Sequence, residues 1–292
     1  MHPGLDKYMM RLRMESKKQE NQSKTSIKSP DVVQTSDFVF SRIQREEGDS
    51  GSLLLAKRKN NRKQQYLVKH ACTDCACNEF VYTKLAQAMG YCMPDAILFQ
   101  LSPDEKRSYF KTEYIIGERY LNVIDANPTY ERIREQAANW KHFFAFCALY
   151  AITNENDGLE ILLADDNRIY RVDTTDAFPL SMWDLDMAGI NQEIGGHNSY
   201  LEIKQQLSSR DFSEILNIAN CNRYFEKCRE ISADSQSYFL EPFLRFREIS
   251  SSYIDDFLNT LCYFYPDYIG DYFKLYISAI QEQCTEYWKE KR

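Results

Sequence analysis

Two short apolar runs near the middle of the chain, 161–163 and 169–172, are joined by a polar turn. Turn-forming residues between strand-forming residues predict a β-hairpin. Acidic residues stand at both of its ends, with Asp157 and Glu160 before the hairpin and Asp173 after it. A hairpin brings its ends together, so these carboxylates are expected to converge in space. Clustered carboxylates repel one another unless they share a cation or a proton, which indicates a magnesium site with a neighbouring base.

The composition is that of a folded globular protein. A chain of 292 residues with 43% hydrophobic residues can bury one large core or two smaller lobes. A net charge of -7 argues against general nucleic-acid binding. No apolar run is long enough to span a bilayer, and the first thirty residues are too polar for a signal peptide. The odd count of nine cysteines, set in apolar patterns, indicates reduced thiols and a cytoplasmic protein.

The sequence pattern changes twice along the chain. Residues 1–35, which contain a stretch rich in Gln, Lys and Ser, are expected to form a flexible arm. Residues 36–117 predict a β-rich lobe with one helix. Residues 118–292 predict a helical lobe that contains the hairpin region 154–179. The expected fold class is therefore α+β, with two lobes.

Local patterns place the elements within each lobe. Strands are expected in the first lobe at 38–40, 53–55, 66–69, 96–101 and 109–116. A helix is expected over 78–89, because apolar residues recur there at helical spacing and Gly90 follows. In the second lobe one long helix is expected over 130–152. Further helices after residue 200 are expected to be separated by Pro242 and Pro266.

Four short motifs follow one another in a distinctive order. They are a glycine loop (EGDSGS, 47–52), a strand ending in lysine (LVK, 67–69), a further strand segment (FKTEY, 110–114) and the acidic segment VDTTDAFP, 172–179. Their order and spacing resemble the protein-kinase superfamily in its atypical branch. The pattern is similar to type II phosphatidylinositol 4-kinases, HipA-type bacterial kinases and secreted effector kinases of intracellular bacteria. The resemblance covers roughly residues 38–179 and implies a two-lobed kinase-like fold.

The resemblance also implies ATP as cofactor, together with Mg²⁺ or Mn²⁺. Glycines let a backbone approach phosphates without side-chain clashes, so the loop is expected to bind them through Gly48, Ser50, Gly51 and Ser52. Lys69 is expected to pair with the α- and β-phosphates and to be oriented by Glu79 on the following helix. Glu113 and Ile115 lie where the family's hinge offers backbone groups to adenine. On its own, each of these residues also has an ordinary structural interpretation as a turn, strand-edge or helix-start residue.

The acidic hairpin supplies the remaining catalytic roles. Asp173 matches the family's metal-binding aspartate, and Glu160 occupies the position of the asparagine that holds a second magnesium. Glutamate oxygen also coordinates magnesium, so this departure is compatible with metal binding. The catalytic loop is less regular, and we favour Asp157 as the base. Glu155 has the family spacing of five residues before the metal ligand and is the alternative, as is a loop without a functional base.

Two other clusters have open interpretations. His70 stands close to Cys72, Cys75 and Cys77, which we take as ordinary thiols rather than as a zinc or acylation site. The run 57–63 holds five cations in seven residues. It is interpreted either as a solvated hairpin tip or as a binding site for a phosphoinositide headgroup or an inositol polyphosphate.

The hypothesis that follows is an ATP-dependent phosphotransferase. A Ser/Thr protein kinase, in the manner of an effector secreted into the cytosol of a host cell, is favoured over a phosphoinositide kinase because no lipid-inserting apolar loop is evident. The acceptor is accordingly a protein or a phosphoinositide. The competing hypotheses are a catalytically inactive kinase-fold binding module and an enzyme that transfers a nucleotide instead of a phosphate.

Overall fold

The computed structural model describes residues 31–43, 54–69, 73–100, 114–178, 215–264 and 267–292. These residues belong to one compact unit, Asp31–Arg292. The strands are β1 (Val32–Gln34), β2 (Phe38–Arg42), β3 (Leu54–Arg58), β4 (Asn61–Lys69), β5 (Ala96–Gln100), β6 (Tyr114–Arg119), β7 (Val123–Ala126), β8 (Ile161–Ala164) and β9 (Ile169–Arg171). The helices are α2 (Thr73–Ala88), α4 (Tyr130–Gln136), α5 (His142–Ile152), α8 (Ile218–Ile231), α9 (Ser235–Glu248), α10 (Ser251–Phe264) and α11 (Asp267–Lys291).

The N-terminal part is a six-stranded sheet with the order β1-β5-β6-β4-β3-β2. All neighbouring strands are antiparallel except β1 and β5, which run parallel. Strand β1 lies within residues 1–35, where the sequence predicted an arm, so the sheet begins earlier than expected. The first thirty residues of that arm lie outside the described residues.

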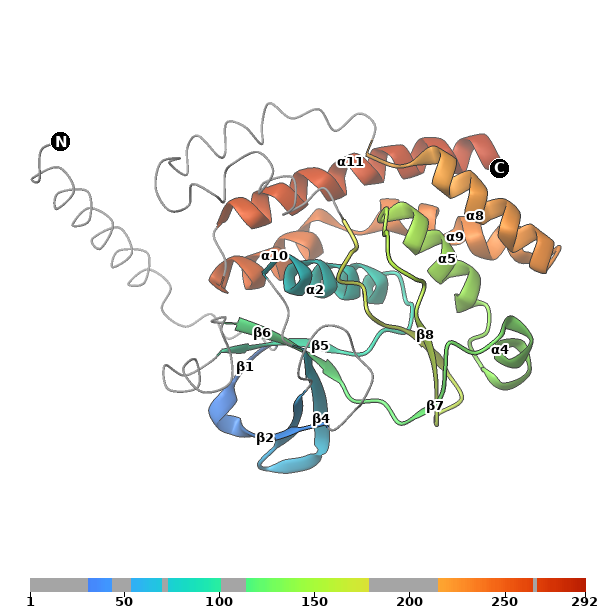
Figure 1. Ribbon diagram of the computed structural model, residues 1–292. Helices are drawn as coiled ribbons and strands as arrows, with labels where there is room; N and C mark the ends of the chain where they lie inside the picture. The colour runs from blue at the N-terminus through green and yellow to red at the C-terminus, as the bar shows by residue number, and fades with distance from the viewer. Residues whose placement is uncertain (1–30, 44–53, 70–72, 101–113, 179–214, 265–266) are drawn as a thin grey trace, which may run out of the picture. The chain divides into compact units, whose positions relative to one another are not determined.

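One helix, α2, packs between the sheet and the helical part. Helix α2 contacts β5 and β6 on one side and α10 on the other, as Figure 1 shows. Its Phe80, Val81 and Leu85 are buried in a core that continues through α5 and the C-terminal helices to Tyr287. A second, smaller core lies within the sheet, around Phe99.

The acidic hairpin predicted from the sequence is present. Strands β8 and β9 pair antiparallel, and β7 adds a third strand beside β8. The turn between β8 and β9 contains Asn167 at φ 56°, a left-handed conformation that asparagine tolerates better than most residues. The hairpin packs against helix α5. Together with the C-terminal helices it confirms the α+β class, with a β-sheet N-terminal region and a helical C-terminal region.

The long helix predicted over 130–152 is wrong, because the chain breaks it into α4 and α5. Asn139, between the two helices, uses its side chain to hold strand β9. Its Nδ2 donates to the carbonyl oxygen of Ile169 (3.0 Å), and its Oδ1 accepts from the amide of Ile169 (2.8 Å). These two hydrogen bonds hold Asn139 outside a helical turn. The side chain of Asn139 thus competes with helix formation, which the periodicity of apolar residues does not reveal.

The prediction that Pro242 separates two helices is also wrong. Pro242 lies inside α9 and is buried in the core. A proline inside a helix removes one backbone hydrogen bond, and here the packing of Phe239, Phe243 and Phe246 on the same helix offsets that loss. Pro266 lies outside the described residues, between the last residue of α10 and the first of α11.

Among the helices of the described residues, none has the length and apolar character needed to cross a bilayer. The cysteines whose side chains are described, from Cys77 to Cys284, are free thiols. This agrees with the reduced state expected from the sequence.

Gly117 in β6 offers a direct test of the sheet packing. A Cβ at this position would lie 2.4 Å from a ring carbon of Phe99, which is fully buried and packs edge-on against Phe38. We expect Gly117→Ala to destabilise the protein by about 1–3 kcal/mol, because the ring has no space to move into. Denaturant unfolding measures the change.

The control is Gly158→Ala. A Cβ at position 158 meets no atom within 4 Å, so the midpoint of unfolding should stay close to that of the unmodified protein. Equal stability of the two variants would show that the contact between Gly117 and Phe99 is not tight.

Candidate functional site

A cavity of about 200 Å³ lies between the N-terminal sheet and the acidic hairpin. Its lining residues come from the sheet, from the connection between the two parts and from the hairpin. They are Ile43, Leu55, Leu67, Pro94, Glu118, Arg119, Tyr120, Leu121, Val123, Leu162 and Val172. Its walls are largely apolar. Such a cavity fits a flat, mostly apolar group that also makes a few polar contacts.

Strand alternation explains why the sheet presents apolar residues on both faces. In β3, Leu54 and Ala56 point into the small core around Phe99, whereas Leu55 between them is only partly buried and lines the cavity. Strand β4 repeats the pattern, and there Leu67 lines the cavity. Because successive side chains of a strand point to opposite faces, one strand serves both the core and the cavity.

The connection between the two parts forms one edge of the cavity. Glu118, the next-to-last residue of β6, is buried, and Tyr120 and Leu121 directly follow the strand. The amide of Tyr120 donates to the carbonyl of Gln65 (2.9 Å) and the amide of Arg119 to the carbonyl of Asp95 (2.8 Å). These bonds hold the connection against the sheet.

A buried ion pair lies beneath the acidic hairpin. The guanidinium of Arg171, the last residue of β9, donates to the carboxylate of Glu155, and both side chains are 0% exposed. Arg171 also donates through Nη1 to the carbonyl oxygen of Glu160 (2.9 Å) and through Nη2 to that of Gly158 (3.4 Å). It donates as well to the carbonyl of Val172. One arginine therefore fastens the whole loop 155–160 to strand β9.

The two ends of the hairpin lie side by side, because the amide of Val172 donates to the carbonyl of Glu160 (3.2 Å). Burial raises the pKa of the Glu155 carboxyl to about 7, and the positive charge of Arg171 acts in the opposite direction. The negative charges of Asp173 and Asp157 raise this pKa further, so both groups lie within electrostatic range of Glu155. Burial acts to lower the pKa of Arg171, and the negative charges of Glu155 and, less strongly, Glu160 raise it. Acidic residues before the hairpin thus act on this arginine.

The two candidate bases have different surroundings. Glu155 is buried and paired with Arg171, whereas Asp157 is exposed. The Oδ1 of Asp157 accepts from the amide of Gly158 (2.7 Å), and the hydroxyl of Tyr150 donates to the carbonyl of Asp157. The loop begins at Asn154, whose φ of 51° turns the chain out of α5. Only Asp157 of these two carboxylates is open to a substrate.

Asp173 directly follows Val172, which lines the cavity. It has a left-handed backbone, with φ 54°, which is unusual for a residue other than glycine. Its Oδ1 accepts a hydrogen bond from the hydroxyl of Thr175 (3.3 Å). The segment then continues to Phe178, which is buried and packs edge-on against Phe273 and Tyr276 of α11.

Two of the predicted residues of the N-terminal part, Lys69 and Glu79, lie in β4 and α2. Lys69 is the last residue of β4, two positions beyond Leu67, and it is paired with Ile116 in β6. Glu79 lies on α2 and is 0% exposed. A carboxylate this deeply buried requires a partner, which agrees with a role other than that of a helix-start residue in solvent.

Several predicted residues lie outside the described residues. These are Gly48, Ser50, Gly51 and Ser52 of the glycine loop, Glu113 of the predicted hinge, and His70 and Cys72. Ile115 is described as part of β6, where it pairs with Phe99. The cavity edge is formed a few residues later, by 118–121.

The basic run 57–63 spans the end of β3, the two-residue turn 59–60 and the start of β4. Two of its cations contact the chain itself. Lys59 Nζ donates to the carbonyl of Ser36 (2.7 Å), and Arg58 donates to the side chain of Gln64 (3.0 Å). Lys57, Arg62 and Lys63 are exposed. The polyanion site expected here stays a prediction.

The sequence analysis missed Arg171 and Asn78. Arg171 is a charged residue in an otherwise apolar strand. The only signal in the sequence was an arginine at a position of β9 whose side chain should point into the core. Asn78 immediately precedes Glu79, and its Nδ2 donates to the carbonyl of Thr175, 97 residues later in the chain (2.9 Å). Contacts over such separations leave no local pattern.

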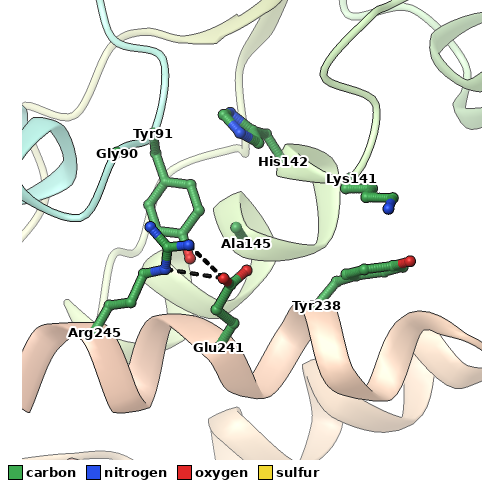
Figure 2. Close-up of a pocket in the computed structure, with 8 residues that line it drawn as sticks. All are labelled: Gly90, Tyr91, Lys141, His142, Ala145, Tyr238, Glu241 and Arg245. Atoms are coloured by element: carbon green, nitrogen blue, oxygen red, sulfur yellow. Dashed lines mark hydrogen bonds and ion pairs between the residues drawn. The ribbon is translucent and has the colours of Figure 1, made fainter.

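A second cavity of about 270 Å³ lies where the end of α2 meets α5 and α9 (Figure 2). Arg245 of α9 pairs with Glu241 (2.5 Å) and donates through Nη1 to the carbonyl of Met89 (2.6 Å), just beyond α2. The buried Tyr91 stands above this ion pair. Arg245 thereby fastens the end of α2 to the helical part of the protein.

The donor set suits a metal only in part. Within the described ranges no group of three or more His, Cys, Asp or Glu side chains is arranged to hold a metal ion. Magnesium in phosphoryl-transfer sites is usually bound by one or two carboxylates together with substrate phosphates. Asp173, which directly follows the cavity-lining Val172, and Glu160, whose carbonyl accepts from the amide of Val172 (3.2 Å), offer carboxylate oxygens that fit this smaller donor set.

The sheet and the helical part are joined by one connection. A cavity lies between them, and the acidic hairpin borders it. This arrangement is a kinase-like fold. Among solved structures, the chain is similar to the crystal structure of a Helicobacter pylori proinflammatory kinase, CtkA, with a TM-score of 0.54. The two share 11% sequence identity, and the match covers 89% of this chain and 98% of that one. This likeness shows the fold. No family model matches the chain, and no curated protein matches it either.

The buried ion pair predicts a large effect on stability. Arg171→Met should destabilise the protein by about 3–5 kcal/mol, because it leaves the Glu155 carboxylate buried without its partner. Arg171→Met combined with Glu155→Leu should recover much of that loss, since no buried charge remains. The free energy of unfolding in denaturant measures both.

Arg229→Met is the matched control. Arg229 pairs with Glu226 at the surface (2.9 Å), with side chains 52% and 59% exposed. Its loss should cost about 0–1 kcal/mol. If Arg171→Met were as mild as Arg229→Met, the pair would not be the anchor of the loop.

Proposed function

We propose that the protein is an ATP-dependent phosphotransferase, and specifically a Ser/Thr protein kinase. The observation that carries this proposal is the position of the cavity. It lies between strands of the sheet and the acidic hairpin, with Leu67 two residues before Lys69 and Val172 directly before Asp173. A lysine and an aspartate thus stand at the ends of two strands that line one cavity.

Adenine would occupy the apolar part of the cavity. Leu55 and Leu67 form one wall and Leu162 and Val172 the other. The backbone of the connection 118–121 runs along the edge, where main-chain donors and acceptors meet the rim of a purine. This replaces the predicted contacts of Glu113 and Ile115 by residues a few positions later in the same strand and its continuation.

The phosphates would lie toward the end of β4. Positions two apart share one face of a strand, so Lys69 stands on the same face of β4 as Leu67. We propose that Lys69 contacts the α- and β-phosphates and that the buried Glu79 orients it. The backbone of the glycine loop, with Gly48, Ser50, Gly51 and Ser52, would cover the phosphates in this proposal.

Asp173 and Glu160 would hold Mg²⁺ or Mn²⁺. A bound metal neutralises the charge that develops on the transferred phosphoryl group. Arg171 prevents the loop from moving away, since it bonds the backbone at Gly158 and Glu160. Asp157, which is exposed, is the residue we propose to accept the proton of the attacking hydroxyl. The paired Glu155 would serve as the counter-ion of Arg171.

The acceptor is proposed to be a serine or threonine of a protein. Action inside a host cell, as an effector, is part of this proposal and is supported by the fold shared with the proinflammatory kinase. The exposed cations Lys57, Arg62 and Lys63 remain the proposed contact for an inositol polyphosphate or phosphoinositide that controls the enzyme.

Nucleotide binding is tested by filling the cavity. Leu162→Trp places a larger ring against the adenine position and should weaken binding of a non-hydrolysable ATP analogue by about tenfold or more, measured by calorimetry. Leu275→Trp is the control, because Leu275 is 40% exposed on α11 and does not line the cavity. Equal affinities of the two variants would place the nucleotide elsewhere.

Catalysis is tested at Asp173. Asp173→Asn should lower transfer of the γ-phosphate to protein by about 100-fold or more, because the metal loses a negative ligand. Metal-free binding of the ATP analogue should persist. The control is Asp165→Asn in the exposed hairpin turn, where Asp165 accepts from Asn122 (2.8 Å).

Parallel reactions with α- and γ-labelled ATP, protein acceptors and phosphatidylinositol vesicles separate the competing functions. Label from the α-phosphate on protein would indicate nucleotide transfer, and labelled lipid a phosphoinositide kinase. Nucleotide binding without any transfer by the unmodified protein would indicate a binding module.

A further inference from the structure

Helix α2 reaches the segment that follows Asp173. Asn78 of α2 is 5% exposed, and its Nδ2 donates to the carbonyl oxygen of Thr175 (2.9 Å). The hydroxyl of the same Thr175 donates to Oδ1 of Asp173 (3.3 Å). Two hydrogen bonds therefore connect a helix that packs on the N-terminal sheet with the carboxylate at the end of the cavity.

The local backbone needs this support. Asp173 has φ 54°, a left-handed conformation that residues other than glycine seldom adopt. Such a conformation persists where the surrounding contacts fix it. The next residues are fixed on both sides, because Thr175 is held by Asn78 and the amide of Phe178 donates to the carbonyl of Thr153 (2.9 Å).

We propose that Asn78 is a positioning residue that sets the carboxylate of Asp173 through Thr175. The inference rests on the proposed function, in which Asp173 binds the metal. Partners of metal-binding carboxylates fix the orientation of those ligands and commonly change metal affinity when they are removed. Asn78 and Thr175 would do this from outside the set of groups that contact the metal.

Asn78 stands next to a second residue of the proposed site. Glu79, the neighbouring residue, is the group proposed to orient Lys69. One turn of α2 would therefore act on both ends of the phosphate site, through Glu79 at the lysine and through Asn78 at the aspartate. A shift of α2 would disturb both ends together.

The test uses two nearly isosteric variants of the full chain. Asn78→Leu removes the amide donor, and Thr175→Val removes the hydroxyl. Binding of Mn²⁺ is measured by calorimetry in the presence of a non-hydrolysable ATP analogue, and binding of the analogue is measured separately without metal. Both variants should bind Mn²⁺ about tenfold more weakly, with metal-free nucleotide affinity changed less than about twofold.

The matched control is Gln87→Leu. Gln87 lies on the same helix, and its amide donates to Asp95 (3.2 Å), away from the hairpin. This variant loses a comparable hydrogen bond and should bind Mn²⁺ normally. Unchanged Mn²⁺ affinity in Asn78→Leu and Thr175→Val, or an equal loss in Gln87→Leu, would overturn the proposal.

Hydrogen exchange provides a readout that needs no ligand. Amides of residues 174–178 should exchange faster in Asn78→Leu than in Gln87→Leu, because the carbonyl of Thr175 loses its donor. Equal exchange rates would also overturn the proposal. If the unmodified protein binds neither the ATP analogue nor Mn²⁺, the proposed function fails; faster exchange in Asn78→Leu would then still show that Asn78 holds the segment, while its role toward a metal would be refuted.

Discussion

The geometry of the acidic loop depends on one buried arginine. A guanidinium removed from water is strongly unfavourable unless its donors find partners. The two terminal nitrogens of Arg171 donate to the carboxylate of Glu155 and to backbone carbonyls, among them those of Gly158 and Glu160, whereas its buried Nε has no hydrogen-bond partner among the described residues. The side chain of Glu155 and the main chain at Gly158 and Glu160 therefore bind the loop to Arg171. The bond at Glu160 uses its carbonyl oxygen and not its carboxylate, and it holds this residue beside β9.

In the proposed function, this arrangement distinguishes two candidates that the sequence alone left open. Both Glu155 and Asp157 were candidates for the base, and the usual spacing of the family favoured Glu155. The two residues differ in burial, because Glu155 is enclosed with Arg171 and Asp157 faces solvent. An acid whose charge is already used inside the protein has little to offer a substrate. The irregular loop thus separates the tasks: one carboxylate holds the arginine and the other is free for chemistry.

Local features of the fold were predictable, and long-range contacts were not. The hairpin at 161–171 and the strands that contain Leu55 and Leu67 follow from neighbouring residues, because short apolar runs between turn residues indicate strands. The break between α4 and α5 depends on Asn139 bonding Ile169, thirty residues later, and it was missed. Arg171 was missed for the same reason. A polar residue inside an apolar strand shows that it needs partners, yet those partners are defined only when the chain folds.

Helix α2 connects these observations, because it belongs to both parts of the protein. It packs on β5 and β6, and its C-terminal end is fastened by Arg245 to α9. Burial raises the pKa of Tyr82 on this helix, and the charge of the nearby Arg171 acts in the opposite direction. Asn78 reaches the segment after Asp173 from the same helix. A cleft between two parts that shared only the connection 118–121 would open and close about that connection. Because α2 is held at both of its ends, a movement of the sheet would also change the contacts to the acidic hairpin. The width of the cavity and the placement of its carboxylates are therefore set together.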